Sequence, residues 1–312
     1  MTLLVDGRRA LLESLVDYAG LFPPTSLPMA DAIAEYRAGR AGDHGWMLGR
    51  FLCPASRLEE LAGLLTASMV AGEAPWRVSV VFDGPMGSDA IAAAGFDRTM
   101  TPGASVELVE VRLPREASDG RAADSAEEVV GPVLDTAFTV AADVVPFVEV
   151  ARGPGVGSAV TAIARVRHRR IRPAGAKLRT GGVTADAFPD PGEVASFVVA
   201  CRHAGLPFKA TAGLHHPVRH RDPGLGVMRH GFLNLLAAAA LAAEDADLED
   251  VTAAVADTDP GAFVVGTTGL AWRGRRVAAG SLLAMRHRLF PAYGSCSFDE
   301  PVEDLVAMGI LE

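Results

Sequence analysis

Residues 145–212 decide the fold class, and they read VPFVEVARGPGVGSAVTAIARVRHRRIRPAGAKLRTGGVTADAFPDPGEVASFVVACRHAGLPFKATA. Three short apolar runs in this stretch alternate with two amphipathic segments of helical periodicity. The predicted strands cover 145–151, 174–179 and 206–212, and the predicted helices cover 157–168 and 190–204. Because the connections are only a few residues long, this alternation predicts a parallel sheet with the helices packed outside it.

The same alternation continues outward from this stretch in both directions. Toward the N-terminus we predict strands at 47–53, 77–83 and 105–113, followed by helices at 56–71, 87–95 and 123–138. After residue 213 the pattern weakens, and we predict helices at 231–243, 247–256 and 278–288. Extended elements around 262–272 and 290–295 would supply the seventh and eighth strands. The run GTTGLAWRGRRV at 266–277 also reads as a surface hairpin.

Eight such units in one domain make a (β/α)8 barrel of the TIM type, and 312 residues suit a single barrel. We therefore predict a barrel domain over residues 46–312, with residues 1–45 as an N-terminal helical extension packed on it. The alternative is an open, doubly wound sheet with an appended C-terminal helical region.

The composition excludes several classes of protein. Apolar residues make up 49% of the chain and charged residues 21%, which is enough for a large core. The net charge of −9 and the lack of basic stretches with interleaved aromatics argue against nucleic-acid binding. The longest apolar run, at 232–243, is too short to cross a membrane.

The compartment follows from the cysteines and the N-terminus. Acidic residues at Asp6 and Glu13 do not fit a signal peptide. The three cysteines, Cys53, Cys201 and Cys296, are odd in number and widely spaced, so we interpret them as packing residues in a reducing cytoplasm.

The basic residues are unusually distributed. Of 29 basic residues, only Lys177 and Lys209 are lysines, and the other 27 are arginines. Arginine replaces lysine where only a surface charge matters, but it cannot supply an amine that loses its proton. The two lysines are therefore the first candidates for a functional site.

Charged residues gather where the predicted strands end. In a barrel, the carboxyl ends of the strands carry the active site. Side chains two residues apart on a strand share a face, which pairs the charges at the ends of the third and fifth predicted strands. These candidates are Glu110, Arg112, Glu149, Lys177, Arg179 and Lys209. Four positive charges among the six, in an acidic protein, indicate a small anionic substrate, either a carboxylate or a phosphate. The alternative is a buried structural ion network.

The two lysines lie 32 residues apart, about one βα unit, and each has a glycine four residues later. Adjacent strands lie about 4.8 Å apart, so the two amines can meet in one pocket. A neighbouring ammonium and burial both lower a lysine pKa, which favours a Schiff-base nucleophile. A two-lysine clamp for a phosphate or carboxylate remains the alternative.

These motifs resemble the class I aldolases of the deoxyribose-phosphate aldolase type. The matching stretches are AKLRTGG, PDPGEVASFVVACRHAGL, PFKATAGLHHP and the closing YGSCS with the acidic helix DEPVEDLVAMGIL. The resemblance implies that Lys177 forms the imine and that Lys209 perturbs it. It also implies that Gly294, Ser295 and Ser297 contact a phosphate.

Further candidates follow Lys209. His215 and His216 could contact substrate or act as acid or base, or bind a divalent ion together with Glu149 and Asp83, although we expect neither a metal nor another cofactor. Asn234, the only asparagine, is either a substrate contact or a satisfied core amide.

Two loops complete the set of candidate segments. The basic loop RHRDPGLGVMRH at 219–230 is either an anion-binding flap or an ordinary exposed loop. The proline-rich segment at 18–28 would cap one barrel end or form a subunit contact, and we expect a homo-oligomer.

Three functions fit these features. The leading hypothesis is a cytoplasmic lyase of the aldolase type, acting on a small anionic carbonyl compound through a lysine imine with Glu149 or Glu110 moving the proton. The second is a lyase, isomerase or hydrolase without an imine, in which a metal or Lys, Arg and His side chains stabilise an enolate or oxyanion. The third is a non-catalytic barrel protein that binds an anion.

Overall fold

The computed structural model describes residues 5–68, 72–114 and 123–312. Within these residues, eight parallel strands close into a barrel in the order β1-β13-β7-β6-β5-β4-β3-β2. The strands are β1 (Val16–Tyr18), β2 (Leu48–Pro54), β3 (Trp76–Val81), β4 (Ala104–Arg112), β5 (Val145–Glu149), β6 (Gly175–Arg179), β7 (Phe208–Thr211) and β13 (Tyr293–Ser295).

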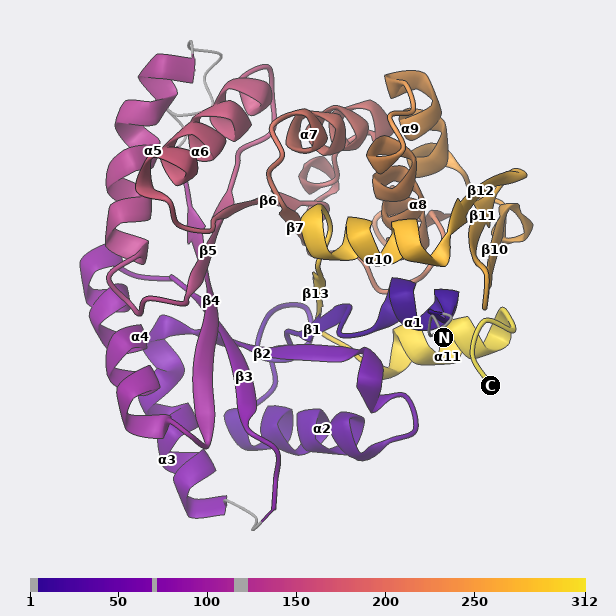
Figure 1. Ribbon diagram of the computed structural model, residues 1–312. Helices are drawn as coiled ribbons and strands as arrows, with labels where there is room; N and C mark the ends of the chain where they lie inside the picture. The colour runs from indigo at the N-terminus through magenta and orange to yellow at the C-terminus, as the bar shows by residue number, and fades with distance from the viewer. Residues whose placement is uncertain (1–4, 69–71, 115–122) are drawn as a thin grey trace.

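The barrel closes through β1, which pairs in parallel with β2 on one side and with β13 on the other. The predicted (β/α)8 TIM-type barrel is therefore confirmed, and the open doubly wound sheet is excluded. Helices surround the strands, as Figure 1 shows.

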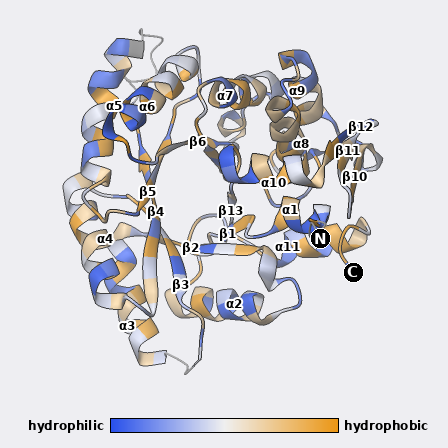
Figure 2. Cartoon of the chain, viewed as in Figure 1, coloured by the Kyte–Doolittle hydropathy of each residue, from blue (hydrophilic) through white to orange (hydrophobic). Residues whose placement is uncertain are grey.

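The helices that follow strands β2 to β6 are close to those predicted. They are α3 (Leu58–Ser68), α4 (Met86–Met100), α5 (Ala123–Ala137), α6 (Val156–Arg170) and α7 (Pro191–His203). The remaining helices are α1 (Gly7–Leu12), α2 (Met29–Ala41), α8 (Phe232–Ala243), α9 (Leu248–Ala256), α10 (Ala279–Arg288) and α11 (Asp299–Ala307). Several outer helices carry both hydrophilic and hydrophobic residues (Figure 2), as expected when one side packs on the strands and the other meets solvent.

Two predictions about the barrel strands are wrong. Strand β1 lies inside residues 1–45, which we had placed outside the barrel. The segment around 262–272 is not a barrel strand, because it belongs to a separate antiparallel sheet of β10 (Phe263–Gly266), β11 (Gly269–Trp272) and β12 (Arg275–Ala278). The hairpin interpretation of that segment is the correct one. Three-residue strands such as β1 are too short to show a period in the sequence.

This correction changes the position of the two lysines in the barrel. Lys177 lies on β6 and Lys209 on β7. Because β1 is the first strand, these are the sixth and seventh strands of the barrel rather than the fifth and sixth.

Local sequence signals fix the unit that carries both lysines. Helix α7 begins with a capping box, in which Asp190 and Glu193 bond reciprocally, and Pro191 occupies its first turn. This start ends the loop after β6 at a defined point. Gly175 opens β6 in contact with Phe147, where a Cβ would also lie 2.8 Å from the Pro207 carbonyl oxygen. The glycine therefore allows the ring of Phe147 to fill the barrel below the lysines.

The loop after β7 forms a small hairpin of β8 (His220–Arg221) and β9 (Met228–Arg229) before α8 begins. Strand β13 leads directly into α11 near the C-terminus. In the described part of the chain, no helix is both long enough and apolar enough to cross a membrane.

Candidate active site

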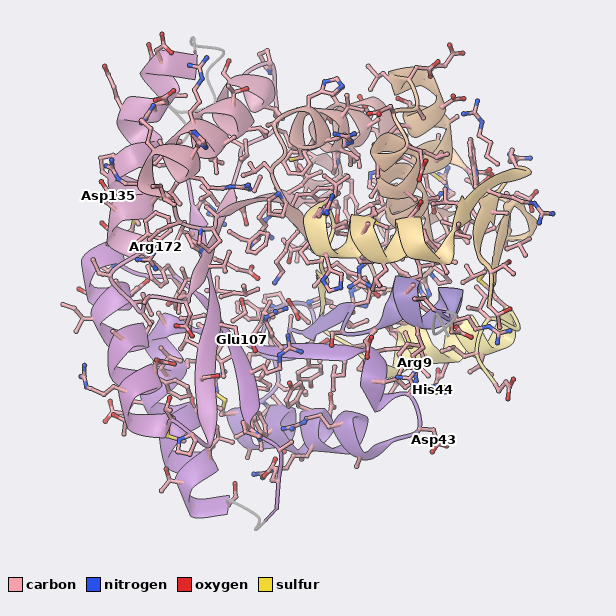
Figure 3. All side chains as sticks on the ribbon, in the orientation of Figure 1. Arg9, Asp43, His44, Glu107, Asp135 and Arg172 are labelled. Carbon is pink, nitrogen blue, oxygen red and sulfur yellow. The ribbon has the colours of Figure 1, made fainter. Side chains whose placement is uncertain are left out.

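Four charged side chains form a row across four neighbouring strands. Arg112 on β4 is the register partner of Glu149 on β5, Glu149 that of Lys177 on β6, and Lys177 that of Lys209 on β7. Partners in a parallel sheet project to the same face, so the row lies at one level inside the barrel. The structure thus brings together the charged residues that the sequence placed at the strand ends. Figure 3 shows side chains filling the space between the strands, with Glu107 of β4 labelled there.

Glu110 lies two residues before Arg112 and joins the two amines. Its Oε2 accepts a hydrogen bond from Lys177 Nζ at 2.8 Å, and its Oε1 accepts one from Lys209 Nζ at 2.6 Å. The Ser79 hydroxyl donates a third bond to Oε1 at 3.1 Å. Glu110 is only 2% exposed. The carboxylate therefore bridges both lysines in a site removed from water.

A third carboxylate, Asp17 on β1, belongs to the cluster and was missed from the sequence. Lys209 Nζ donates to Asp17 Oδ2 at 2.5 Å, and the Arg50 amide donates to Asp17 Oδ1 at 2.7 Å. Asp17 is fully buried. The signal in the sequence was a single acidic residue between Val16 and Tyr18, in a segment that we had interpreted as helical.

The charges hold Lys177 as an ammonium. Burial acts against its charged form, but Glu110 and Glu149, whose Oε2 lies 3.0 Å from Nζ, outweigh burial and raise its pKa. The sequence-based expectation of a lowered lysine pKa is therefore wrong for Lys177. Because the Glu110 carboxylate lies between the two amines, each amine is closer to a negative charge than to the other positive charge.

The carboxylates shift in the opposite direction. Burial favours protonated Glu110, but the charges of Lys177 and Lys209 outweigh it and hold the pKa of Glu110 well below its usual range. Burial likewise opposes ionised Glu149, yet Lys177 and Arg179 together lower its pKa to about 2. Both carboxylates are ionised at neutral pH.

Two arginines lie at the outer edge of the cluster. Arg112 Nε lies 3.2 Å from Glu149 Oε1, and Arg179 Nε lies 3.4 Å from the same oxygen. Their side chains are 71% and 44% exposed. Without these two arginines, the cluster has three carboxylates (Asp17, Glu110 and Glu149) and two ammonium groups (Lys177 and Lys209). The arginines make the region net positive on the side that faces solvent.

A cavity of about 510 Å³ opens above the cluster. Its wall includes Lys177, Glu110 and Arg179, together with residues from the loops that follow the barrel strands. Phe22, Pro23 and Pro24 lie on the same wall, so part of the proline-rich segment caps this end of the barrel as one of our two interpretations expected. A cavity at the carboxyl ends of the strands is where barrel enzymes bind substrate.

A larger hollow of about 1030 Å³ lies at the opposite end of the barrel. It is lined by residues just before β6 and β7, such as Pro173 and Pro207, and by side chains of the outer helices. Size favours this hollow, but the charged cluster and the direction of the strands favour the smaller cavity. We assign the candidate site to the smaller cavity because Lys177 and Glu110 of the buried charge cluster line it and because it lies at the carboxyl ends of the strands.

The segment that the resemblance assigns to phosphate binding lies only partly on the cavity wall. Gly294 and Cys296 lie on the cavity wall. Ser295 is 2% exposed, and its side chain faces away because strand residues alternate. The hydroxyl of Ser297 accepts a hydrogen bond from the Glu300 amide, in the first turn of α11, at 3.2 Å. Of the three residues implied, the structure brings only Gly294 to the cavity.

The two histidines are each held by a carboxylate of α11. His215 Nδ1 lies 2.7 Å from Glu300 Oε2, and His216 Nδ1 lies 2.6 Å from Asp304 Oδ2. His215 lines the cavity. The metal alternative would need the histidines near Glu149 and Asp83. The described residues contain no group of three or more His, Cys, Asp or Glu side chains placed to hold a metal, and Asp83 bonds Ser56.

Asn234 is a core residue rather than a substrate contact. Its amide oxygen accepts a hydrogen bond from the Arg219 amide, and its Nδ2 donates to the Ala254 and Asp257 carbonyls, each at 2.8 Å. It is fully buried. The side-chain amide therefore supplies hydrogen-bond partners for backbone groups where α8, α9 and the loop before α8 meet.

The basic loop at 219–230 is partly exposed and partly anchored. Arg229 and Leu225 lie on the cavity wall, and the Arg229 guanidinium pairs with Asp222. His230 is buried, and its Nε2 hydrogen-bonds the Pro189 carbonyl at 2.8 Å. The hairpin therefore forms one side of the cavity and brings a second arginine to its wall.

No model of a known protein family matches the sequence, and no curated protein matches it.

Proposed function

We propose that the protein is an enzyme that forms an imine between Lys177 and a small carbonyl compound bearing a carboxylate or phosphate. The reaction would be of the aldolase or lyase type. The observation that carries this proposal is the amine of Lys177, which lies on the cavity wall in contact with both Glu110 and Glu149. The TIM barrel is a fold that commonly serves enzymes, and the motif resemblance supports the same chemistry.

The two lysines have different roles in this proposal. Lys177 reaches the cavity, whereas Lys209 is 1% exposed and bonded to both Asp17 and Glu110. Lys177 is therefore the nucleophile. Lys209 holds Glu110 in place and keeps it ionised.

Imine formation requires Lys177 to lose its proton first. Glu149, 3.0 Å away, accepts that proton. The free amine attacks the carbonyl carbon, so the C–N bond forms and the π pair moves to oxygen. Glu149 then returns the proton to that oxygen, which leaves as water with the second amine proton. The product is a protonated imine, so charge and atoms balance.

The anion of the substrate promotes this transfer. Arg179 lies on the cavity wall and contacts Glu149. Burial raises the pKa of Glu149, and the charges of Lys177 and then Arg179 lower it. A carboxylate or phosphate bound to Arg179 draws that charge away. Glu149 then becomes a stronger base only when substrate is bound. The later proton transfers at carbon fall to Glu149 or Glu110.

Borohydride trapping tests the imine. The protein would be incubated with glycolaldehyde, pyruvate or dihydroxyacetone phosphate, then reduced and mapped by mass spectrometry. The mapping is simple because the chain has only two lysines. We expect mass added at Lys177, little at Lys209, and none at position 177 in Lys177→Met. Surface arginines cannot form the adduct, so an adduct confined to the N-terminal amine would refute the proposal.

A second candidate needs no imine, and one observation favours it. The pKa of Lys177 is raised, so the resting group is an ammonium. An ammonium beside the ionised Glu149 can stabilise an enolate while the carboxylate moves a proton, as in an isomerase or lyase. This function predicts turnover of a carbonyl substrate that borohydride does not inactivate.

The cellular setting is also a proposal. All three cysteines are free and buried, which supports a reducing compartment such as the cytoplasm. The predicted homo-oligomer stays a prediction.

A further inference from the structure

A second group of reactive side chains lies on the wall of the same cavity. Cys296 follows β13, His215 lies in the loop after β7, and Glu300 is in the first turn of α11. The Cys296 Sγ lies 3.5 Å from His215 Nε2, and His215 Nδ1 lies 2.7 Å from Glu300 Oε2. Both Cys296 and His215 line the cavity. A thiol, a base and a carboxylate that orients the base are thus connected in order.

Cys296 differs from the other two cysteines in its surroundings. Cys53 and Cys201 are fully buried, and burial raises the pKa of each thiol. Burial also raises the pKa of Cys296, but hydrogen bonds with His215 and Thr25 outweigh it and lower the pKa overall. Lower pKa and access to a cavity are the two properties of a reactive cysteine.

Glu300 determines which nitrogen of His215 faces the thiol. The Glu300 carboxylate accepts a hydrogen bond from Nδ1–H, so Nε2 is the nitrogen left to receive the thiol proton. The hydrogen bond with Cys296 is the main reason that the pKa of His215 is raised, and Glu300 adds to it against the effect of burial. The imidazolium that forms when the thiol ionises is therefore stabilised.

His216 provides a built-in comparison. It lies next to His215 and pairs with Asp304, four residues after Glu300 on α11. Residues four apart share one face of a helix, so both pairs fasten the same loop to the same helix. Of the two histidines, His215 is the one that contacts the thiol. The fastening of the loop and the activation of the thiol can therefore be separated by substitution.

We propose that Cys296, His215 and Glu300 form a second nucleophilic site in this cavity, whose thiolate adds reversibly to the carbonyl carbon of a small aldehyde. The Sγ–C bond forms, the π pair of the carbonyl moves to its oxygen, and that oxygen takes the proton from His215 Nε2. The product is a hemithioacetal, and the reverse step releases the aldehyde. No oxidant or other reactant is needed.

The wall around the thiol limits the compound that fits. Ala19, Phe22 and Leu52 line the same cavity, whose volume of about 510 Å³ suits a small molecule. Another titratable group that interacts with Cys296 is Tyr18, whose hydroxyl donates to Glu35 at 2.6 Å and whose pKa is raised by burial and by that bond. Tyr18 is therefore neutral and does not compete with His215 for the thiol proton.

The inference does not rest on the imine at Lys177. It requires only the thiol, the imidazole and an aldehyde. If both proposals hold, the cavity contains two nucleophiles for carbonyl compounds, an amine on β6 and a thiol after β13.

Alkylation with iodoacetamide tests the thiolate. The rate at each cysteine would be followed by peptide mass spectrometry across the pH range, with Cys53 and Cys201 as internal controls for a folded protein. We expect Cys296 to react with an apparent pKa below the ordinary value of about 8.5. His215→Asn should raise that pKa by about one unit or more, so the rate well below it falls about tenfold. His216→Asn should leave it unchanged. An ordinary pKa in the wild type, or equal effects of the two substitutions, would overturn the proposal.

Carbon NMR with glycolaldehyde labelled at the carbonyl carbon tests the addition itself. We expect a signal from a tetrahedral carbon bonded to sulfur in the wild type, and its loss in Cys296→Ser. In Lys177→Arg the signal should persist, because no imine is involved. A signal that survives in Cys296→Ser and disappears in Lys177→Arg would assign the adduct to the amine and would overturn the thiol site while leaving the imine proposal intact.

Discussion

Glu110→Gln is the most informative single substitution, because Glu110 is the one carboxylate among the described residues that contacts both lysine amines. The change keeps the shape of the side chain and removes its charge. An amide has one oxygen, so it can accept from one lysine while its NH₂ group faces the other. Lys177 would keep Glu149, and Lys209 would keep Asp17. The variant therefore weakens the charge cluster but leaves each lysine with one carboxylate partner.

The expected shift in the lysine pKa follows from the distance. Two unit charges 2.8 Å apart, the separation of Lys177 Nζ and Glu110 Oε2, interact by about 6 kcal/mol at an effective dielectric constant of about 20. That energy corresponds to about four pKa units as an upper limit. Relaxation of the remaining charges reduces it. We expect the pKa of Lys177 to fall by at least about one unit.

NMR of protein labelled only in lysine measures this shift directly. Two lysines give two signals, which Lys209→Arg assigns. In the wild type, the Lys177 signal should titrate above its usual pKa, and in Glu110→Gln it should move down. Imine trapping should then reach its half-maximal rate at lower pH. A Lys177 pKa that differs by less than about 0.5 unit between the two proteins would refute the electrostatic argument.

The same substitution should also cost stability. Removing one partner from a buried charge cluster costs about 3–5 kcal/mol, because charges remain buried without their partner. Urea denaturation measures the change. Glu60→Gln is the matched control, since Glu60 pairs with Arg57 at the surface, 2.8 Å away, and such a pair contributes below about 1 kcal/mol. Equal losses in the two variants would contradict the role of burial.

Three further substitutions test other parts of the structure. The pKa of Glu149 is lowered to about 2, so its ionisation adds about 3 kcal/mol to the free energy of unfolding above the unfolded pKa of about 4.3, and this stability is lost as the pH falls toward 2. Glu149→Gln should flatten the fall of the urea midpoint with pH. Parallel curves for the two proteins would exclude this contribution of Glu149. Gly175→Ala should cost about 1–3 kcal/mol in urea denaturation because a Cβ meets Phe147 and the Pro207 carbonyl, whereas an unchanged midpoint would mean that the ring moves freely. Asn234→Ala should cost about 3 kcal/mol by leaving three buried backbone groups unpaired, and thermal denaturation together with unchanged imine trapping would separate this core role from substrate contact.

The sequence was sufficient for the fold class and for most of the charged site. Six strand–helix units have enough residues to show their periods, and strands β2 to β7 lie close to the predicted positions. The two lysines were prominent because they stand among 27 arginines. Glu110, Glu149, Arg112 and Arg179 followed from their places at strand ends.

The sequence was insufficient where an element is short or where a role depends on a partner. Strand β1 has three residues and shows no period, so Asp17 was missed. Cys296 read as a packing residue because its histidine lies 81 positions earlier. Asn234 had two equal interpretations until its three backbone partners were visible.

By itself, the sequence determined which side chains could do chemistry at this site and that the strands would bring many of them to one end of a parallel sheet. Only the tertiary structure decided how their charges act on one another. Glu110 lies between the two amines, so the pKa of Lys177 is raised where proximity of like charges alone would have lowered it. The order of charges across a closed barrel depends on register and on the reach of each side chain, and neither is written in the spacing of residues along the chain.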